Sequence, residues 1–222
     1  MVNFKYSPDE LGIKNVWWGK EEKYWIEISN KDKNEEHTKY RGDFGYDLRA
    51  PTKDWSGQKN ISMYSLLGLV RPNDVIFHCS RTKGAIIGKS VASGFPYITQ
   101  GTYFSPQARR FAGAPKFPKR KIYKVKLKKF KKLENPLYED QLNTRYKDEI
   151  IATLNSLYEF YGTARGTTSE DIWGYPVTPN IYCGINMFYE GDWTKRNISV
   201  GFSPVFFAKM PIKILKILNL IS

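Results

Sequence analysis

Cysteine and histidine are scarce in this sequence. It contains two cysteines, Cys79 and Cys183, and two histidines, His37 and His78. The cysteines are far apart and form no CxxC pair, which excludes a conventional zinc finger or zinc nuclease module. Two lone thiols are typical of a reducing compartment. We therefore expect a cytoplasmic protein that holds no metal and no cofactor.

Membrane signatures and nucleotide-binding loops are also missing. No run of about 18 apolar residues occurs, and the first residues include no apolar signal core, so we expect no membrane partner. There is no GxxxxGK[ST] loop and no GxGxxG turn. Asp43, Asp47 and the pair Asp148 and Glu149 lack the strand context of a metal-dependent nuclease. We expect no catalytic site, and a nuclease with an unrecognised site stays open as an alternative.

Positive charge and aromatic rings are abundant. The chain has 35 Lys and Arg against 22 Asp and Glu, a formal net charge of +13. Such an excess favours a polyanionic partner, and nucleic acid is the leading candidate. Aromatic residues make up 15% of the chain, more than a core of this size requires. Some of them are therefore expected to stack on a ligand.

Residues 74–91 predict a β-hairpin with a polar tip. Two apolar runs, at 75–77 and 85–88, flank a turn that offers hydrogen-bond donors from Ser80, Arg81, Thr82 and Lys83. Donors of this kind suit a phosphate or a base edge. An ordinary surface hairpin with a polar tip is the alternative.

Residues 122–130 predict a half-buried strand with a basic outer face. Apolar and lysine side chains alternate there, and nine of the fourteen residues from 119 to 132 are Lys or Arg. Lysines can simply protect a sheet edge, or they can contact phosphates. The inward residues are Tyr123, Val125 and Leu127, and the outward ones are Lys124, Lys126 and Lys128.

The remaining segments complete a single domain with an extension. We expect strands at residues 15–19, 24–28, 181–189 and 198–207, helices at 61–69 and 138–160, an irregular segment at 45–51 and an aromatic loop at 94–106 that continues to 119. If Trp17 and Trp18 share a strand, one is core and the other is available elsewhere. The apolar tail at 212–221 favours a packed element or a subunit contact. The predicted boundary separates residues 1–162 from a β-rich extension at 163–222 of unknown role.

Several segments, taken in order, resemble the PUA-like superfamily, in particular EVE and YTH domains and the N-terminal modules of McrB-type modification-dependent restriction systems. The resemblance covers residues 15–133, somewhat more than half of the chain. Its carriers are Val-Trp-Trp at 16–18, Gly-Tyr-Asp-Leu-Arg-Ala-Pro at 45–51, the strand at 70–80, Gly-Ala-Ile-Ile-Gly at 84–88 and the basic strand at 121–133.

This resemblance implies an α+β fold, a twisted PUA-like β-barrel flanked by helices, with the C-terminal extension added. It also implies a non-catalytic module that recognises modified, methylated DNA by flipping a base into an aromatic pocket. By position, the pocket residues are Trp18, Lys20, Tyr46, Arg49, Trp55, Ser80, Arg81, Phe95 and Tyr97. The phosphate-binding residues are Lys83, Arg109, Arg110, Lys116, Lys124, Lys126 and Lys128.

One departure from the family pattern concerns the cage itself. The family's cage tryptophan falls at Leu48 or Arg49 here, so Tyr46, Trp55 or a loop aromatic replaces it, or the modified base differs. The implied partners are modified DNA and a nuclease or NTPase on another domain or subunit. An RNA reader of the same fold is the first alternative, and the sequence does not identify the modification.

Overall fold

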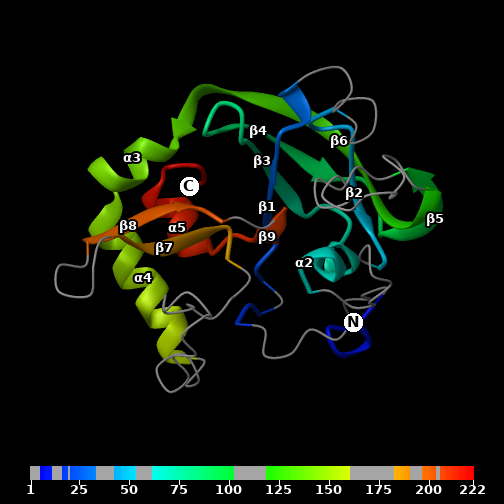
Figure 1. The fold of residues 1–222 in the computed structure, drawn as a ribbon, viewed down its shortest axis with the longest axis horizontal. Helices are drawn as coiled ribbons and strands as arrows, with labels where there is room; N and C mark the ends of the chain where they lie inside the picture. The colour runs from blue at the N-terminus through cyan, green and yellow to red at the C-terminus, as the bar shows by residue number, and fades with distance from the viewer. Residues whose placement is uncertain are drawn as a thin grey trace, which may run out of the picture.

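The structure is a computed structural model that describes residues 6–11, 17–19, 21–33, 43–53, 62–102, 119–160, 183–190, 197–203 and 206–222. Most of the described chain belongs to nine strands and several short helices (Figure 1). The strands are β1 (Tyr24–Ser29), β2 (Asp47–Pro51), β3 (Val75–Ser80), β4 (Ala85–Ala92), β5 (Tyr97–Thr102), β6 (Lys119–Tyr138), β7 (Ile185–Glu190), β8 (Asn197–Phe202) and β9 (Phe207–Lys209). The helices are η1 (Asp9–Leu11), η2 (Lys31–Lys33), α2 (Ser62–Ser65), η3 (Leu66–Leu69), α3 (Glu139–Thr144), α4 (Lys147–Phe160) and α5 (Ile212–Ile217).

Seven of the strands form one mixed sheet that curls into a half-barrel. Its order is β2-β6-β4-β3-β1-β9, with β5 also paired to β6. The pair β1 and β3 is parallel and the other pairs are antiparallel. Strand β6 runs the width of the molecule from α3 to β5 (Figure 1). Its first half pairs with β2 and β5, and its second half pairs with β4. The predicted α+β class and barrel-like sheet are confirmed at this level.

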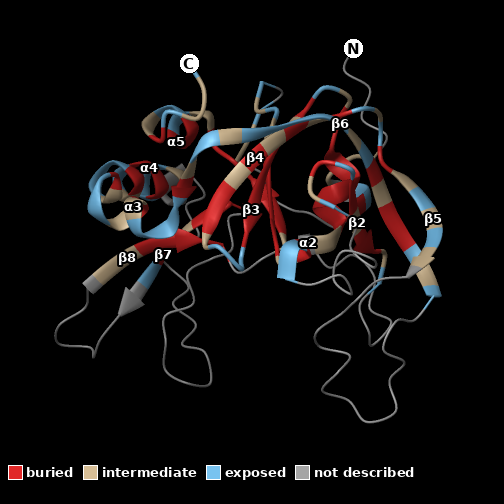
Figure 2. Cartoon of the chain, turned by 90° about the horizontal axis from the view of Figure 1, so that it is seen from above, coloured by how far each residue is buried: buried red, intermediate tan, exposed pale blue. Residues whose placement is uncertain are grey.

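Alternation along β1 sends side chains into two separate cores. Ile26 and Ile28 belong to the first core, together with Phe77 and Cys79 of β3 and residues of α3, α4 and α5. Trp25 belongs to the second core, which lies on the other face of the sheet and includes η3 and residues of β2 and β6. Figure 2 shows buried residues on both sides of the sheet. Successive strand residues point to opposite faces, so one short strand serves both cores.

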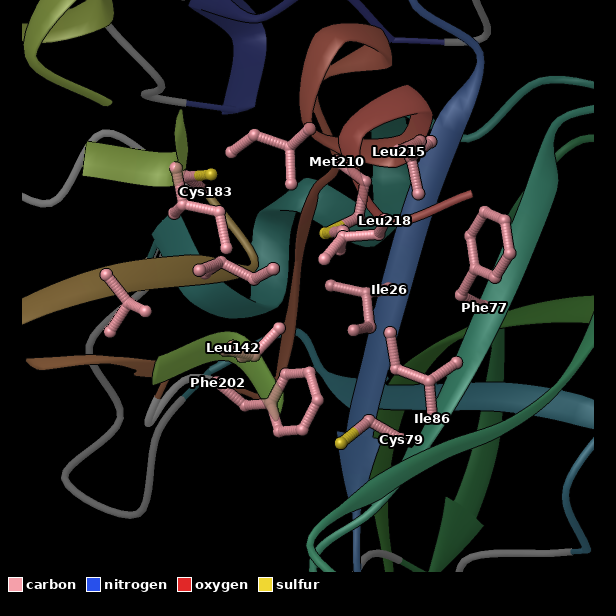
Figure 3. Packing of buried hydrophobic residues seen from close by; sticks show 14 of the residues in the cluster. Ile26, Phe77, Cys79, Ile86, Leu142, Cys183, Phe202, Met210, Leu215 and Leu218 are labelled. Carbon is pink, nitrogen blue, oxygen red and sulfur yellow. The ribbon is translucent and has the colours of Figure 1, made fainter. Parts of the chain in front are cut away.

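The C-terminal segment packs into the first core. Strand β9 pairs with β1, and Ile214 and Leu215 of α5 are fully buried. Figure 3 shows Cys183, Leu215 and Leu218 packed around Ile26 of β1. The described part of residues 183–222 thus completes the sheet and its core. The predicted boundary at residues 162 and 163 falls outside the described residues and stays a prediction.

Several predicted elements are confirmed. The strand at 24–28, the hairpin at 74–91 and the basic strand are present as β1, β3 with β4, and β6. Strand β6 is longer than predicted because β4 continues the ladder to Tyr138. The apolar tail is a packed helix, as expected. No described helix has the length and apolar character needed to cross a membrane.

Other segments differ from the prediction. The irregular segment at 45–51 contains β2, whose Pro51 is the last residue of the strand. The aromatic loop at 94–106 contains β5, paired with the basic strand. The single helix predicted at 138–160 is two helices, which break at residues 145–146. Residues 17–19 are not in a strand, and the rest of the strand predicted at 15–19 lies outside the described residues. Both of its tryptophans are partly buried, Trp17 against the first core and Trp18 against the second.

Lys209 of β9 is a buried lysine beside the second core. Its side chain is 0% exposed, and its Nζ lies 3.7 Å from the centre of the Trp25 ring without a hydrogen-bond partner among the described residues. Burial lowers the pKa of Lys209 to about 7, although Asp74 partly opposes this change. The folded protein therefore binds this proton only below about pH 7, whereas an unfolded lysine keeps it to a pKa of about 10.4.

We expect Lys209→Met to remove a pH dependence of stability. Between about pH 7 and pH 10 the unfolded chain binds one more proton at Lys209 than the folded chain does. The free energy of unfolding should therefore rise with pH by about 1.4 kcal/mol per unit from this group. Urea unfolding of the unchanged protein and of the variant across this range gives two slopes of unfolding free energy against pH. The difference between these slopes removes the contribution of the other titrating groups. An unchanged slope in the variant would contradict the burial of a neutral amine.

Candidate nucleic-acid interface

Strand β6 presents a row of exposed lysines. Tyr123 and Val125 are buried and Leu127 is half-buried, so the predicted inward face is confirmed. We name the exposed lysines between residues 119 and 129 of β6 the lysine strip: Lys119, Lys121, Lys126, Lys128 and Lys129. Among the described residues, none of them takes part in an ion pair. The strip is therefore a line of positive charge along the strand.

Lys124 differs from the strip because it contacts a buried carboxylate. Its Nζ lies 3.0 Å from Oδ2 of Asp47, and Arg49 also pairs with Asp47 at 2.8 Å. Burial alone would raise the pKa of Asp47, but hydrogen bonds from Arg49 and Lys124 hold it below its ordinary value. Lys124 lies between Arg49 of β2 and Tyr97 of β5 in the register of the sheet. The structure thus brings Arg49, Tyr97 and Lys124 together, and Asp47 neutralises part of their charge.

A β-bulge lies at the end of the lysine strip, at Lys129. The pairing of β4 and β6 shifts between Lys89 and Val91, opposite Lys129, whose φ of 55° is left-handed. A bulge of this kind re-aims the next side chain. The Phe130 ring consequently lies over Gly45 and Gly88, where a Cβ on either glycine would collide with it. Gly45 also has a left-handed φ of 81°, so both the backbone conformation and the nearby ring favour glycine there.

We define the aromatic cluster as Phe130 and the two rings that flank Gly45 in the sequence, Phe44 and Tyr46, because the Phe130 ring lies against Gly45. The rings of Phe44 and Phe130 both meet the His78 ring edge-on, with distances between ring centres of 5.7 and 5.5 Å. Phe130 is 38% exposed and Tyr46 is 68% exposed, the highest value among the large apolar side chains that the structure describes. Rings that stay exposed within a basic surface are able to stack on bases.

A buried polar chain lies beneath the aromatic cluster. Ser90 Oγ is 2.7 Å from Nε2 of His78, and Nδ1 of His78 is 2.8 Å from Glu27. The other oxygen of Glu27 is 2.8 Å from Lys31 Nζ, which also donates to the carbonyl of Asp47. Burial alone would raise the pKa of Glu27, but Lys31 and His78 lower it below its ordinary value. Burial lowers the pKa of His78, so a neutral ring donates from Nδ1 to Glu27 and accepts from Ser90.

These contacts have the connectivity of a Ser-His-Glu triad but not its accessibility. Glu27 and His78 are 0% exposed and Ser90 is 1% exposed. A nucleophile has to reach its substrate, and this hydroxyl is enclosed under the aromatic cluster. These contacts are therefore best explained as a buried polar network within the core, with His78 as a structural residue.

The predicted hairpin tip lies away from Arg49 and Tyr97. Ala85 pairs with Tyr138 at the end of β6, whereas Tyr97 pairs with Lys124 in its first half. Ser80 is fully buried, donates to Asp32 and accepts from the backbone of Lys83, so it holds the turn together. Lys83 and Arg81 are exposed. A cavity of about 150 Å³ lies beside Arg81, and Phe202 is the one aromatic residue among its described lining residues.

The other predicted residues are dispersed. Trp18 is half-buried against the second core, and its ring centre lies 6.0 Å from that of Trp25. Phe95 is 39% exposed just before β5. Five predicted residues lie outside the described part of the chain: Lys20, Trp55, Arg109, Arg110 and Lys116. The structure thus gathers no single pocket from the described members of the predicted set, and their roles in binding stay predictions.

Sequence reasoning missed Phe44 and Phe130. A signal for Phe130 exists, because the apolar positions of β6 fall on odd residues from Tyr123 to Leu127 and then on residue 130. A shift of one residue in a period of two is the mark of a bulge. No comparable signal in the sequence points to Phe44.

Comparison with known proteins gives distant likenesses. No family model and no curated protein matches the chain. The N-terminal domain of McrB from Staphylothermus marinus is similar at 18% identity and a TM-score of 0.30, over 58% of this chain and 82% of that one. Protein Atu2648 from Agrobacterium tumefaciens is similar at 16% identity and a TM-score of 0.27, over 59% of this chain and 77% of that one.

Proposed function

We propose that this protein is a non-catalytic nucleic-acid-binding module that uses β6 as its binding strand. The observation that carries the proposal is the lysine strip, a row of exposed lysines along one strand that form no ion pair within the described part of the chain. Neutralising phosphates releases condensed counterions, and this release supplies most of the affinity of such surfaces. The net charge of +13 adds long-range attraction for a polyanion.

The aromatic cluster gives this surface a means to hold a base. Phe130 directly follows Lys129, the last residue of the lysine strip, so a base next to a phosphate bound there can reach its ring. Stacking on an aromatic side chain contributes about 1–3 kcal/mol per base. Phe130 and Tyr46 then act as the stacking surface; the sequence predicted Tyr46 for this pocket but not Phe130.

The finer part of the proposal concerns the ligand and the family. We propose that the module has a PUA-like fold and reads a modified, methylated base of DNA after base flipping, as the specificity component of a restriction system. The ordered motifs of residues 15–133 support this proposal, and so does the curled mixed sheet. Extruding the base exposes the added group to ring contacts, which a groove contact does poorly. A nuclease or NTPase would reside on another domain or subunit.

A fluorescence-polarisation panel tests the proposal. It compares methylated and plain DNA and matched RNA at one salt concentration. We expect preference for methylated DNA, and Phe130→Ala should weaken its binding roughly 5- to 100-fold, the range that the loss of one stacked base implies. Phe188→Ala is the matched control, because Phe188 is 37% exposed, like Phe130, but lies on β7. Preference for RNA, or equal effects of both variants, would contradict the proposal.

A further inference from the structure

A cavity of about 500 Å³ opens on the opposite face of β6 from the aromatic cluster. Leu137, Tyr146 and Leu218, which line the cavity, belong to the first core. Phe130 instead meets His78, whose side chain points to the opposite face of β3 from its neighbours Phe77 and Cys79 of that core. The cavity is walled by β4 and β6, by the junction of α3 and α4, and by the C-terminal turn at residues 218–220. Elements from three separate parts of the chain therefore build it.

Positive charge is concentrated in this cavity. Lys89, Lys131, Lys132 and Arg145 line it, and Glu134 is the one acidic residue among its described lining residues. None of the four cations forms an ion pair within the described part of the chain. The cavity therefore carries an excess of three positive charges, by subtraction of one acid from four bases.

Two of these lysines are held side by side by the sheet. Lys89 of β4 pairs directly with Lys131 of β6 in the antiparallel register. The Cβ atoms of such a pair are about 4.5–5.5 Å apart, and like charges at that distance destabilise a sheet. An anion between the two ammonium groups would convert this repulsion into attraction.

The shape and the lining indicate the size of that anion. Small-molecule sites usually have volumes of about 300–1,000 Å³ and combine apolar walls with a few placed polar groups. Leu133, Leu218 and Leu220 are apolar lining residues, and Tyr146 is an aromatic one. Lysine and arginine together are the usual ligands of phosphate groups. A concave site of this size suits a free nucleotide better than a continuous strand.

We propose that this cavity binds a small phosphorylated ligand of nucleotide size, a nucleoside di- or triphosphate, through Lys89, Lys131 and Arg145. The site is independent of the nucleic-acid surface, because it lies on the other face of the sheet. It also gives the C-terminal residues 218–220 a function as one wall of a ligand site.

Isothermal titration with ATP, ADP and adenosine tests this proposal. ATP and ADP should bind and adenosine should not, because the phosphates supply the attraction. The variant Lys131→Gln/Arg145→Gln should weaken ATP binding at least 10-fold. Both side chains are exposed, so folding should persist, and a thermal melt without ligand verifies it. The control Lys126→Gln/Lys128→Gln, which removes two charges from the lysine strip, should leave ATP binding unchanged.

Three outcomes would overturn the proposal. The first is no saturable heat with ATP or ADP at millimolar concentration. The second is an equal loss in the control variant, which would show binding by diffuse charge. The third is competition between ATP and a short single-stranded DNA with the same dependence on Lys131, which would assign the cavity to the phosphate track of a nucleic acid.

Discussion

Replacing Lys126, Lys128 and Lys129 by glutamine should remove most nucleic-acid binding. All three side chains are exposed on β6, and none is paired among the described residues. Each phosphate contact contributes about 0.9 to the slope of log K against log salt, so three lost contacts should flatten it by about 2.7. The affinity at about 0.1 M salt should then fall on the order of 100-fold or more. Polarisation titrations at several salt concentrations measure both quantities.

The matched control removes the same amount of charge elsewhere. Lys33, Lys213 and Lys216 are exposed but lie outside β6, on η2 and α5. Changing these three to glutamine should reduce affinity only slightly, through the lower net charge. If both triple variants lost affinity equally, binding would depend on total charge and the lysine strip would have no particular role.

Glu27→Ala should destabilise the fold severely. Glu27 is fully buried and pairs with both Lys31 and His78. The change removes the carboxylate that neutralises the Lys31 ammonium, which is 2% exposed. Breaking a buried pair from one side costs about 3–5 kcal/mol, a large part of the 5–15 kcal/mol that stabilises a typical domain. Urea unfolding followed by tryptophan fluorescence measures the loss.

A second variant separates the buried charge from the packing. Glu27→Gln/Lys31→Met removes both charges and keeps side chains of similar size, so it should be more stable than Glu27→Ala alone. A double variant as unstable as Glu27→Ala would show that the loss comes from the shape of the site, and would remove the ion pair from the explanation.

The sheet could be predicted where local pattern and burial agree. Apolar runs identified β1, β3 and β4, and strict alternation identified the first half of β6. Strand β2 was missed because Gly45 and Pro51, residues typical of loops, bound this segment. Asp47 is buried there because Arg49 and Lys124 neutralise it, a pairing that depends on the neighbouring strand.

The binding surface was predictable in part for the same reason. The face of Lys124, Lys126 and Lys128 follows from the sequence by alternation, whereas the bulge at Lys129 breaks this pattern. The hairpin tip was harder, because a polar side chain in a turn serves either a ligand or the turn itself, and Ser80 serves the turn. The aromatic cluster depends on residues 44–46 lying beside Phe130, a contact between segments more than 80 residues apart.

Photocrosslinking tests most directly whether β6 and the aromatic cluster form the nucleic-acid surface. A single-stranded DNA carrying 5-iododeoxyuridine is irradiated with the protein, and the crosslinked residues are identified by mass spectrometry. The proposed surface predicts crosslinks at Tyr46 and Phe130 that disappear in the Lys126, Lys128 and Lys129 variant. Crosslinks confined to residues 80–84, or to the cavity beside Arg145, would contradict it.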